Sequence, residues 1–155
     1  MKRFRFKLDV LMRLYGREEE ARKKELGEAN RLLLAAEQEL TRLGAEYDAY
    51  QEKEAVLRTQ GESVMEMRLY VQYIFDLKRR IEQKRDEVRS AMVRVKVCRD
   101  RLVEIKRKVK SIENIKQKRV DAWKKERNRF EMKTLDDLCG IQFLRDHTAF
   151  AARSG

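Results

Sequence analysis

Side chains able to do catalytic or metal chemistry are scarce in this sequence. It contains one histidine, His147, and two cysteines, Cys98 and Cys139, without a CxxC spacing. A catalytic triad, a zinc site and a histidine-based acid–base pair each lack parts. No glycine-rich phosphate loop occurs, and the many carboxylates follow a charged helical pattern that offers no pocket to shift their pKa. The sequence therefore predicts a protein that is not an enzyme and uses no cofactor, metal or small-molecule substrate.

The chemistry of binding is concentrated between Leu69 and Phe75. Seven consecutive uncharged residues, six of them apolar, stand here in a chain of which 42% is charged. If Ile74 and Leu77 occupy the buried seam of a coiled coil, Tyr73 lies on the flank of the helix and Phe75 faces water. An exposed aromatic patch of this kind indicates a partner site. The alternative is that the aromatic side chains pack over the end of the fold.

Positive charge is the second binding feature. The segment from Lys78 to Lys133 holds 22 Lys and Arg against 9 Asp and Glu, a net charge of +13, whereas the whole chain carries +11. Such an excess indicates an acidic partner, which could be nucleic acid, an anionic membrane face or an acidic protein cavity. Further cations lie near the beginning of the chain: Lys2, Arg3, Arg5 and Lys7.

Two long amphipathic helices must position these features. The chain has 155 residues, no proline and only 6 glycines, which permits long helices. One seam runs from Leu8 to Leu57 with spacings that alternate between four and three, and 12 of its 15 positions are apolar. A second seam runs from Met67 to Phe130, with 15 of 19 positions apolar. Sustained heptads predict a coiled coil, although the high charge by itself would also allow disorder.

The two seams are separated by a short break that contains Gly61 and Ser63. Glycine can close a helix and serine can cap the next one. We therefore predict an all-α, two-helix antiparallel coiled-coil hairpin in a single domain. Its parts are a first helix over about 5–58, a turn over about 59–63, a second helix over about 64–139 and a flexible tail over 140–155.

The hairpin defines which residues face each other. Leu57 should face about Met67, and Leu8 should lie near Lys116, so that the second helix outruns the first by about 15–20 residues. The same pairing sets Tyr47 and Tyr50 opposite the aromatic stretch. A parallel dimer with a kink at Gly61 is the alternative arrangement.

The sequence also bears on location. The basic start of the chain lacks the apolar core of a signal peptide, and no apolar run approaches the roughly 20 residues that span a bilayer. Two cysteines without a disulfide or metal spacing fit a reducing compartment. We expect a cytoplasmic protein, soluble or peripheral to the cytoplasmic face of the inner membrane.

Three stretches carry a resemblance to a known family. The chain opens with FRFKLDVLMRLYGREEE at residues 4–20, continues with QYIFDLKRRIEQK at residues 72–84, and ends its long pattern with KTLDDL at residues 133–138. Taken in this order, the three stretches resemble the FliJ family of the flagellar type III export apparatus, and the resemblance covers nearly the whole chain.

The resemblance implies a stalk similar to the central stalk of rotary ATPases. It implies three partners: the hexameric export ATPase, whose ring it would enter and help to assemble, the membrane export-gate protein, and export chaperones. The residues that we assign to the ATPase ring lie at the terminal end of the hairpin: Phe4, Phe6, Leu8, Arg119, Trp123, Arg127 and Phe130.

The resemblance also implies an export-gate contact on the second helix. The family uses an aromatic residue, a leucine, a small residue and a histidine there, which match Tyr73, Leu77, Arg80 and Lys84. The first two fit the pattern, and the last two depart from it. The heptad register adds Phe75 and Tyr50 to this surface.

Three other functions stay open at this point. One is the homologous stalk of a virulence secretion system, which the same sequence pattern allows. Another is a coiled coil that binds nucleic acid, although the cations are spread along a paired rod and no free basic arm is present to enter a groove. The third is a scaffolding coiled coil that only dimerises.

Overall fold

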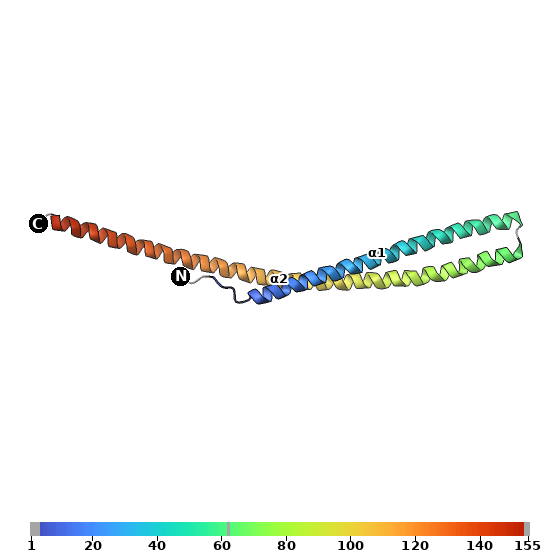
Figure 1. Ribbon diagram of the computed structural model, residues 1–155, viewed down its shortest axis with the longest axis horizontal. Coiled ribbons are helices and arrows are strands. Elements are labelled where there is room, and N and C mark those ends of the chain that lie inside the picture. The colour runs from blue at the N-terminus through green and yellow to red at the C-terminus, as the bar shows by residue number, and fades with distance from the viewer. Residues whose placement is uncertain (1–3, 62, 154–155) are drawn as a thin grey trace. The chain divides into compact units, whose positions relative to one another are not determined.

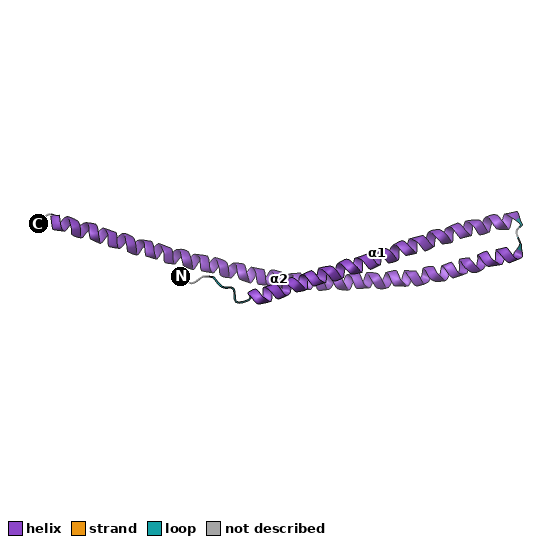
Figure 2. Ribbon diagram, in the orientation of Figure 1, coloured by secondary structure: helices purple, strands orange, loops and turns teal. Residues whose placement is uncertain are grey.

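The computed structural model describes residues 4–61 and 63–153. Helix α1 covers Asp9–Gln60 and helix α2 covers Val64–Arg153, and the described residues contain no strand (Figure 2). The chain divides into two compact units, and both helices contribute to each. We call residues 16–106 the hairpin unit, and residues 4–15 with 107–153 the stem unit, and each is described by itself.

The turn between the helices depends on two residues. Gly61 has a φ of 74°, a left-handed conformation that suits glycine and ends α1. Ser63 starts α2, since its Oγ accepts a hydrogen bond from the Met65 amide at 3.2 Å and its carbonyl accepts one from the Met67 amide at 3.1 Å. Glu62, between them, lies outside the described residues.

In the hairpin unit the two helices lie side by side and run in opposite directions (Figure 1). Near the turn, the ring of Tyr50 contacts that of Tyr73, with centroids 4.5 Å apart. Farther from the turn, Ala29 of α1 packs with Val95 and Cys98 of α2 in a buried cluster. These contacts within one chain confirm the antiparallel hairpin over the kinked parallel dimer.

The buried seam follows the predicted heptads over most of its length. Every position of the first seam, from Leu8 to Leu57, is buried or half-buried, and so is every position of the second seam from Met67 to Lys116. Burial in a two-stranded coil is confined to one stripe of each helix, so the remaining positions face water.

The stem unit departs from the predicted register. Beyond Lys116 the half-buried residues are Val120, Trp123 and Arg127, whereas the predicted seam positions Arg119 and Glu126 are exposed. The heptad assignment was therefore wrong by one residue at Arg119 and Glu126, but right at Trp123. No α1 residue precedes Asp9, so past this point no partner helix holds α2 to a 3.5-residue repeat, and the stripe drifts as in a straight helix.

The C-terminal part of α2 also differs from the prediction. We expected the helix to end near residue 139, but it continues to Arg153. Gly140 lies inside it, and a helical glycine costs about 1 kcal/mol against alanine without breaking the helix. The side chain of His147 and residues 154–155 lie outside the described part of the chain. Neither described helix has an apolar stretch long enough for a membrane crossing.

Candidate functional site

The aromatic residues near the turn of the hairpin unit form a packed cluster across the two helices. The ring of Tyr50 lies 4.5 Å from Tyr73 and 5.8 Å from Tyr70, centroid to centroid. The Tyr73 hydroxyl donates a short hydrogen bond to the Glu46 carboxylate. This hydrogen bond, together with desolvation and the charge of Glu46, raises the pKa of Tyr73. Tyr73 therefore joins α2 to α1 rather than standing free on the flank.

Phe75 lies on the other side of α2. Its side chain is 68% exposed, as the heptad register predicted. Two residues along a helix are separated by about 200° of rotation, so Tyr73 and Phe75 cannot belong to one continuous patch. The prediction of a single uncovered aromatic surface was therefore wrong: one aromatic residue packs across the hairpin and the other faces water.

Phe75 has exposed apolar neighbours on its side of α2. One is Val71, from the uncharged stretch over residues 69–75, and the other is Val64, which the sequence analysis did not single out. Val64, Met67, Arg68 and Val71 line a shallow groove there. The heptad register could have identified both valines. They occupy positions beside the seam that charged residues usually fill, so apolar residues there indicate a surface that binds a partner.

The other predicted gate residues have different surroundings. Leu77 is 0% exposed and lies in the seam, so it supports the surface from beneath. Arg80 is exposed and Lys84 is half-buried. Both contribute to the lowered pKa of Glu39 on α1, although the hydrogen bond from Arg42 is the largest cause of that shift. Their charges are thus partly balanced by the first helix.

In the stem unit, the N-terminal segment packs onto α2 before α1 begins. The ring of Phe4 lies 6.0 Å from that of Trp123. The ring of Phe6 lies 5.8 Å from both the Lys116 ammonium and the Arg119 guanidinium. Aromatic rings and cations are held together here by ring packing and cation–π attraction.

Two further contacts complete this stem cluster. Asp9, in the first turn of α1, lies 3.7 Å from Lys116, a predicted seam residue that was not among those assigned to the ATPase ring. The Arg127 guanidinium lies 5.2 Å from the Trp123 ring, and its Nε is 3.3 Å from a Glu131 carboxylate oxygen. The seam residue Leu8 accepts the first hydrogen bond of α1, from the Met12 amide at 2.9 Å.

Six of the seven residues assigned to the terminal end are therefore in or beside one cluster. The seventh, Phe130, is 56% exposed farther along α2. It borders a shallow groove with Met132, Lys133 and Asp136. Among the described residues, no group of histidine, cysteine and carboxylate side chains could hold a metal ion.

Comparison with known families decides what kind of protein this is. Residues 4–148 match the family model described as Flagellar FliJ protein. The chain belongs to the FliJ family. FliJ proteins are non-catalytic components of flagellar protein export, so this chain is a flagellar export-related protein. No curated protein and no solved structure matches the chain.

The FliJ match includes both surfaces, from Phe4 in the stem cluster to Phe75 near the turn. It also extends past Phe130 along α2. The match to a flagellar family favours the flagellar function over the virulence stalk that the sequence left open. Membership of FliJ implies contact with components of the export apparatus.

Proposed function

We propose that this protein is the stalk of the flagellar export ATPase, similar in role to the central stalk of a rotary ATPase. Its stem unit enters the hexameric ATPase ring and promotes ring assembly. The observation that carries this proposal is the stem cluster, in which Phe4, Phe6 and Trp123 lie among Lys116, Arg119 and Arg127. Aromatic residues and arginine are the side chains most enriched at the centre of protein interfaces.

The part of α2 that follows the stem cluster supports the same proposal. Large apolar side chains remain more than half exposed along it: Phe130, Met132, Leu135, Leu138, Ile141, Phe143 and Leu144. A helix that is apolar on several faces is normally buried by other elements. Insertion into the cavity of a partner would cover these side chains.

The hairpin unit supplies the second half of the proposal. Tyr73, Arg80 and Lys84 lie toward one flank of α2, with Tyr50 packed against Tyr73 and Leu77 beneath them. Phe75 is a separate exposed contact on the opposite side of the same helix. We assign this region to the membrane export-gate protein, which the stalk would couple to the ATPase. Unloaded export chaperones would use the same coiled coil, with the stalk held at the cytoplasmic face of the inner membrane.

Truncation after Val120 tests the ATPase role. It removes Trp123, Arg127 and the exposed part of α2, but leaves the hairpin unit intact. Stimulation of the cognate ATPase should be lost, while circular dichroism should show that the remaining helices persist. Phe130→Ala should weaken stimulation several-fold, since an exposed aromatic is a common hot spot. Ile115→Ala, at a partly exposed position before the cluster, serves as the control. Undiminished stimulation by the truncated chain would exclude the proposal.

A further inference from the structure

The two flanks of the hairpin unit differ in how their charges are balanced. On the flank of Tyr73, carboxylates of α1 face polar and cationic groups of α2. Glu46 accepts the hydrogen bond from Tyr73. The pKa of Glu28 is lowered mainly by its hydrogen bond from Arg31, and the charge of Arg94 on α2 adds to this. Charges on this side are therefore compensated between the helices.

The opposite flank is basic. Two rows of α2 residues, each repeating every seven positions, form it between Val64 and Lys106, and they contain a single carboxylate, Glu82. All of its cations are exposed: Arg68, Lys78, Arg85, Arg89, Lys96, Arg99 and Lys106. Only Arg85 and Arg89 form ion pairs within the described part of the chain, and both partners belong to α2 itself. We call this face the basic flank.

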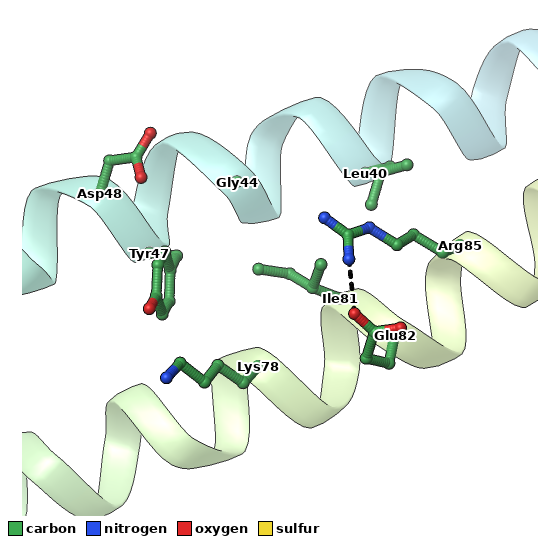
Figure 3. Close-up of a pocket in the computed structure, with 8 residues that line it drawn as sticks. All are labelled: Leu40, Gly44, Tyr47, Asp48, Lys78, Ile81, Glu82 and Arg85. Atoms are coloured by element: carbon green, nitrogen blue, oxygen red, sulfur yellow. Dashed lines mark hydrogen bonds and ion pairs between the residues drawn. The ribbon is translucent and has the colours of Figure 1, made fainter.

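A groove opens on the basic flank beside the seam. Its lining includes Leu40, Gly44 and Tyr47 from α1 and Ile81 from α2 (Figure 3). Leu40 and Tyr47 point toward α2, and between them Gly44 presents no side chain. Apart from its own helix, no heavy atom lies within 4 Å of where a Cβ on Gly44 would be. The floor of the groove is thus apolar and open.

Cations stand at the rim of this groove. The Lys78 ammonium lies 5.8 Å from the centre of the Tyr47 ring and has no carboxylate partner among the described residues. Arg85 is paired with Glu82 on the same helix (Figure 3). The remaining carboxylate of the lining, Asp48, is directed away from α2. Lys78 is therefore the cation of the described lining that remains without a carboxylate partner beside the apolar floor, next to the paired Arg85 and Glu82.

We propose that the basic flank docks an acidic amphipathic helix of a partner protein, which forms a third strand of the coiled coil. Its apolar stripe would lie on the groove floor, and its carboxylates would meet Lys78, Lys96 and the other cations of the flank. The positions of the two rows that hold these cations repeat every seven residues, or about 10 Å along α2. A helix packed alongside presents its side chains with the same repeat.

Other anionic partners fit this surface less well. Duplex DNA and an anionic membrane both attract cations, but neither inserts an apolar stripe into a narrow groove. The inference goes beyond the proposed stalk function, because the groove and the cations of the basic flank lie opposite the Tyr73 flank and outside the stem cluster. Of the residues assigned to the export gate, only Phe75 lies in the rows of this flank. The binding experiment that tests it does not depend on whether the protein stimulates an ATPase.

A designed peptide tests the proposal with the full-length protein. The probe is a fluorescent peptide of four heptads, with alanine and leucine at its seam positions and glutamate beside them. Fluorescence anisotropy should show saturable binding. The same peptide with lysine in place of glutamate should not bind, because it would meet the cations of the flank.

Variants locate the binding. Lys78→Glu and Lys96→Glu should each weaken peptide binding about tenfold, as for charged residues at an interface centre. Gly44→Leu should weaken it similarly by filling the groove. The matched controls lie on the opposite flank: Arg101→Glu for the charge and Ala35→Leu for the added side chain. Both should leave binding unchanged, and circular dichroism should show each variant to be as helical as the parent.

Three results would overturn the proposal. The first is no saturable binding of the glutamate peptide. The second is equal loss of binding in the controls and in the basic-flank variants. The third is tighter, Lys78-dependent binding of duplex DNA or of anionic phospholipid vesicles, which would make one of those the ligand. None of these results depends on whether the protein stimulates an ATPase.

Discussion

Gly27 and Gly61 differ in what an added methyl group would meet. Gly27 lies inside α1, and apart from that helix no heavy atom lies within 4 Å of where its Cβ would be. Gly61 also has open space, but its φ of 74° is one that residues with a side chain rarely adopt. The first glycine only loosens a helix, whereas the second is required by the turn.

Alanine at these two positions should therefore have opposite effects on stability. Gly27→Ala should raise the free energy of unfolding by up to about 1 kcal/mol through helix propensity. Gly61→Ala should lower it by about 1–2 kcal/mol, the usual cost of a left-handed alanine. Urea denaturation followed by circular dichroism measures both. A stabilising Gly61→Ala would show that the turn does not need the observed backbone.

Within helix α2, the angular position of a side chain around the helix axis determines whether it is buried in the seam or exposed to solvent. Leu77 and Phe75 are two residues apart, yet one is fully buried in the seam and the other is 68% exposed. Tyr73 is intermediate, because its ring packs on Tyr50 and its hydroxyl binds Glu46. One helix thus carries structural and surface functions within a single turn.

This difference predicts how truncations should separate stability from binding. Leu77→Ala should cost about 2–5 kcal/mol, at the low end because a two-helix coil is thin. Phe75→Ala should change stability by less than about 0.5 kcal/mol, and should weaken export-gate binding if the surface acts as proposed. Thermal melting and a binding titration with the gate protein measure the two effects.

Tyr73→Ala should cause a loss of stability between those of Leu77→Ala and Phe75→Ala. It removes contacts with α1 and should therefore lower the melting temperature. Its effect on gate binding must therefore be compared with that of Tyr73→Phe, which keeps the ring and loses only the hydrogen bond to Glu46. A Phe75→Ala variant that melts much earlier and still binds the gate would show that Phe75 is structural.

For the molecule as a whole, charge is distributed unevenly along the sequence. The net charge is +11, but the segment from Lys78 to Lys133 alone carries +13, so the rest of the chain is close to neutral. The ion pairs of α1 mostly join residues three or four apart on the same helix. An uncompensated positive surface of this size should speed the approach of acidic partners.

Association with the export ATPase should therefore depend on salt. Raising the ionic strength from about 0.1 M to about 1 M shortens the screening length from about 10 Å to about 3 Å. We expect the association rate to fall on the order of tenfold, while dissociation changes less. Stopped-flow mixing measures both rates. Lys124→Glu with Lys125→Glu should flatten the salt dependence, and a rate insensitive to salt would argue against electrostatic steering.

The sequence by itself determined the all-α class and most of the seam, and it favoured the antiparallel pairing over the parallel dimer. Heptad spacing is a local property, and a stripe of apolar residues from Leu8 to Leu57 can be buried only against a similar stripe. The glycine between the two stripes pointed to the turn for an equally local reason. Three stretches in a fixed order, at residues 4–20, 72–84 and 133–138, also suggested the FliJ family. The family match over residues 4–148 confirmed this resemblance.

Only the tertiary structure decided which side chains are free to bind. Tyr73 is joined to α1 through Glu46 and Tyr50, which lie more than twenty residues away in sequence, and Trp123 is covered by Phe4 from the other end of the chain. The shift of the seam after Lys116 likewise follows from where α1 begins. Periodicity cannot supply such results, because they depend on contacts between distant residues and on where a partner helix is missing.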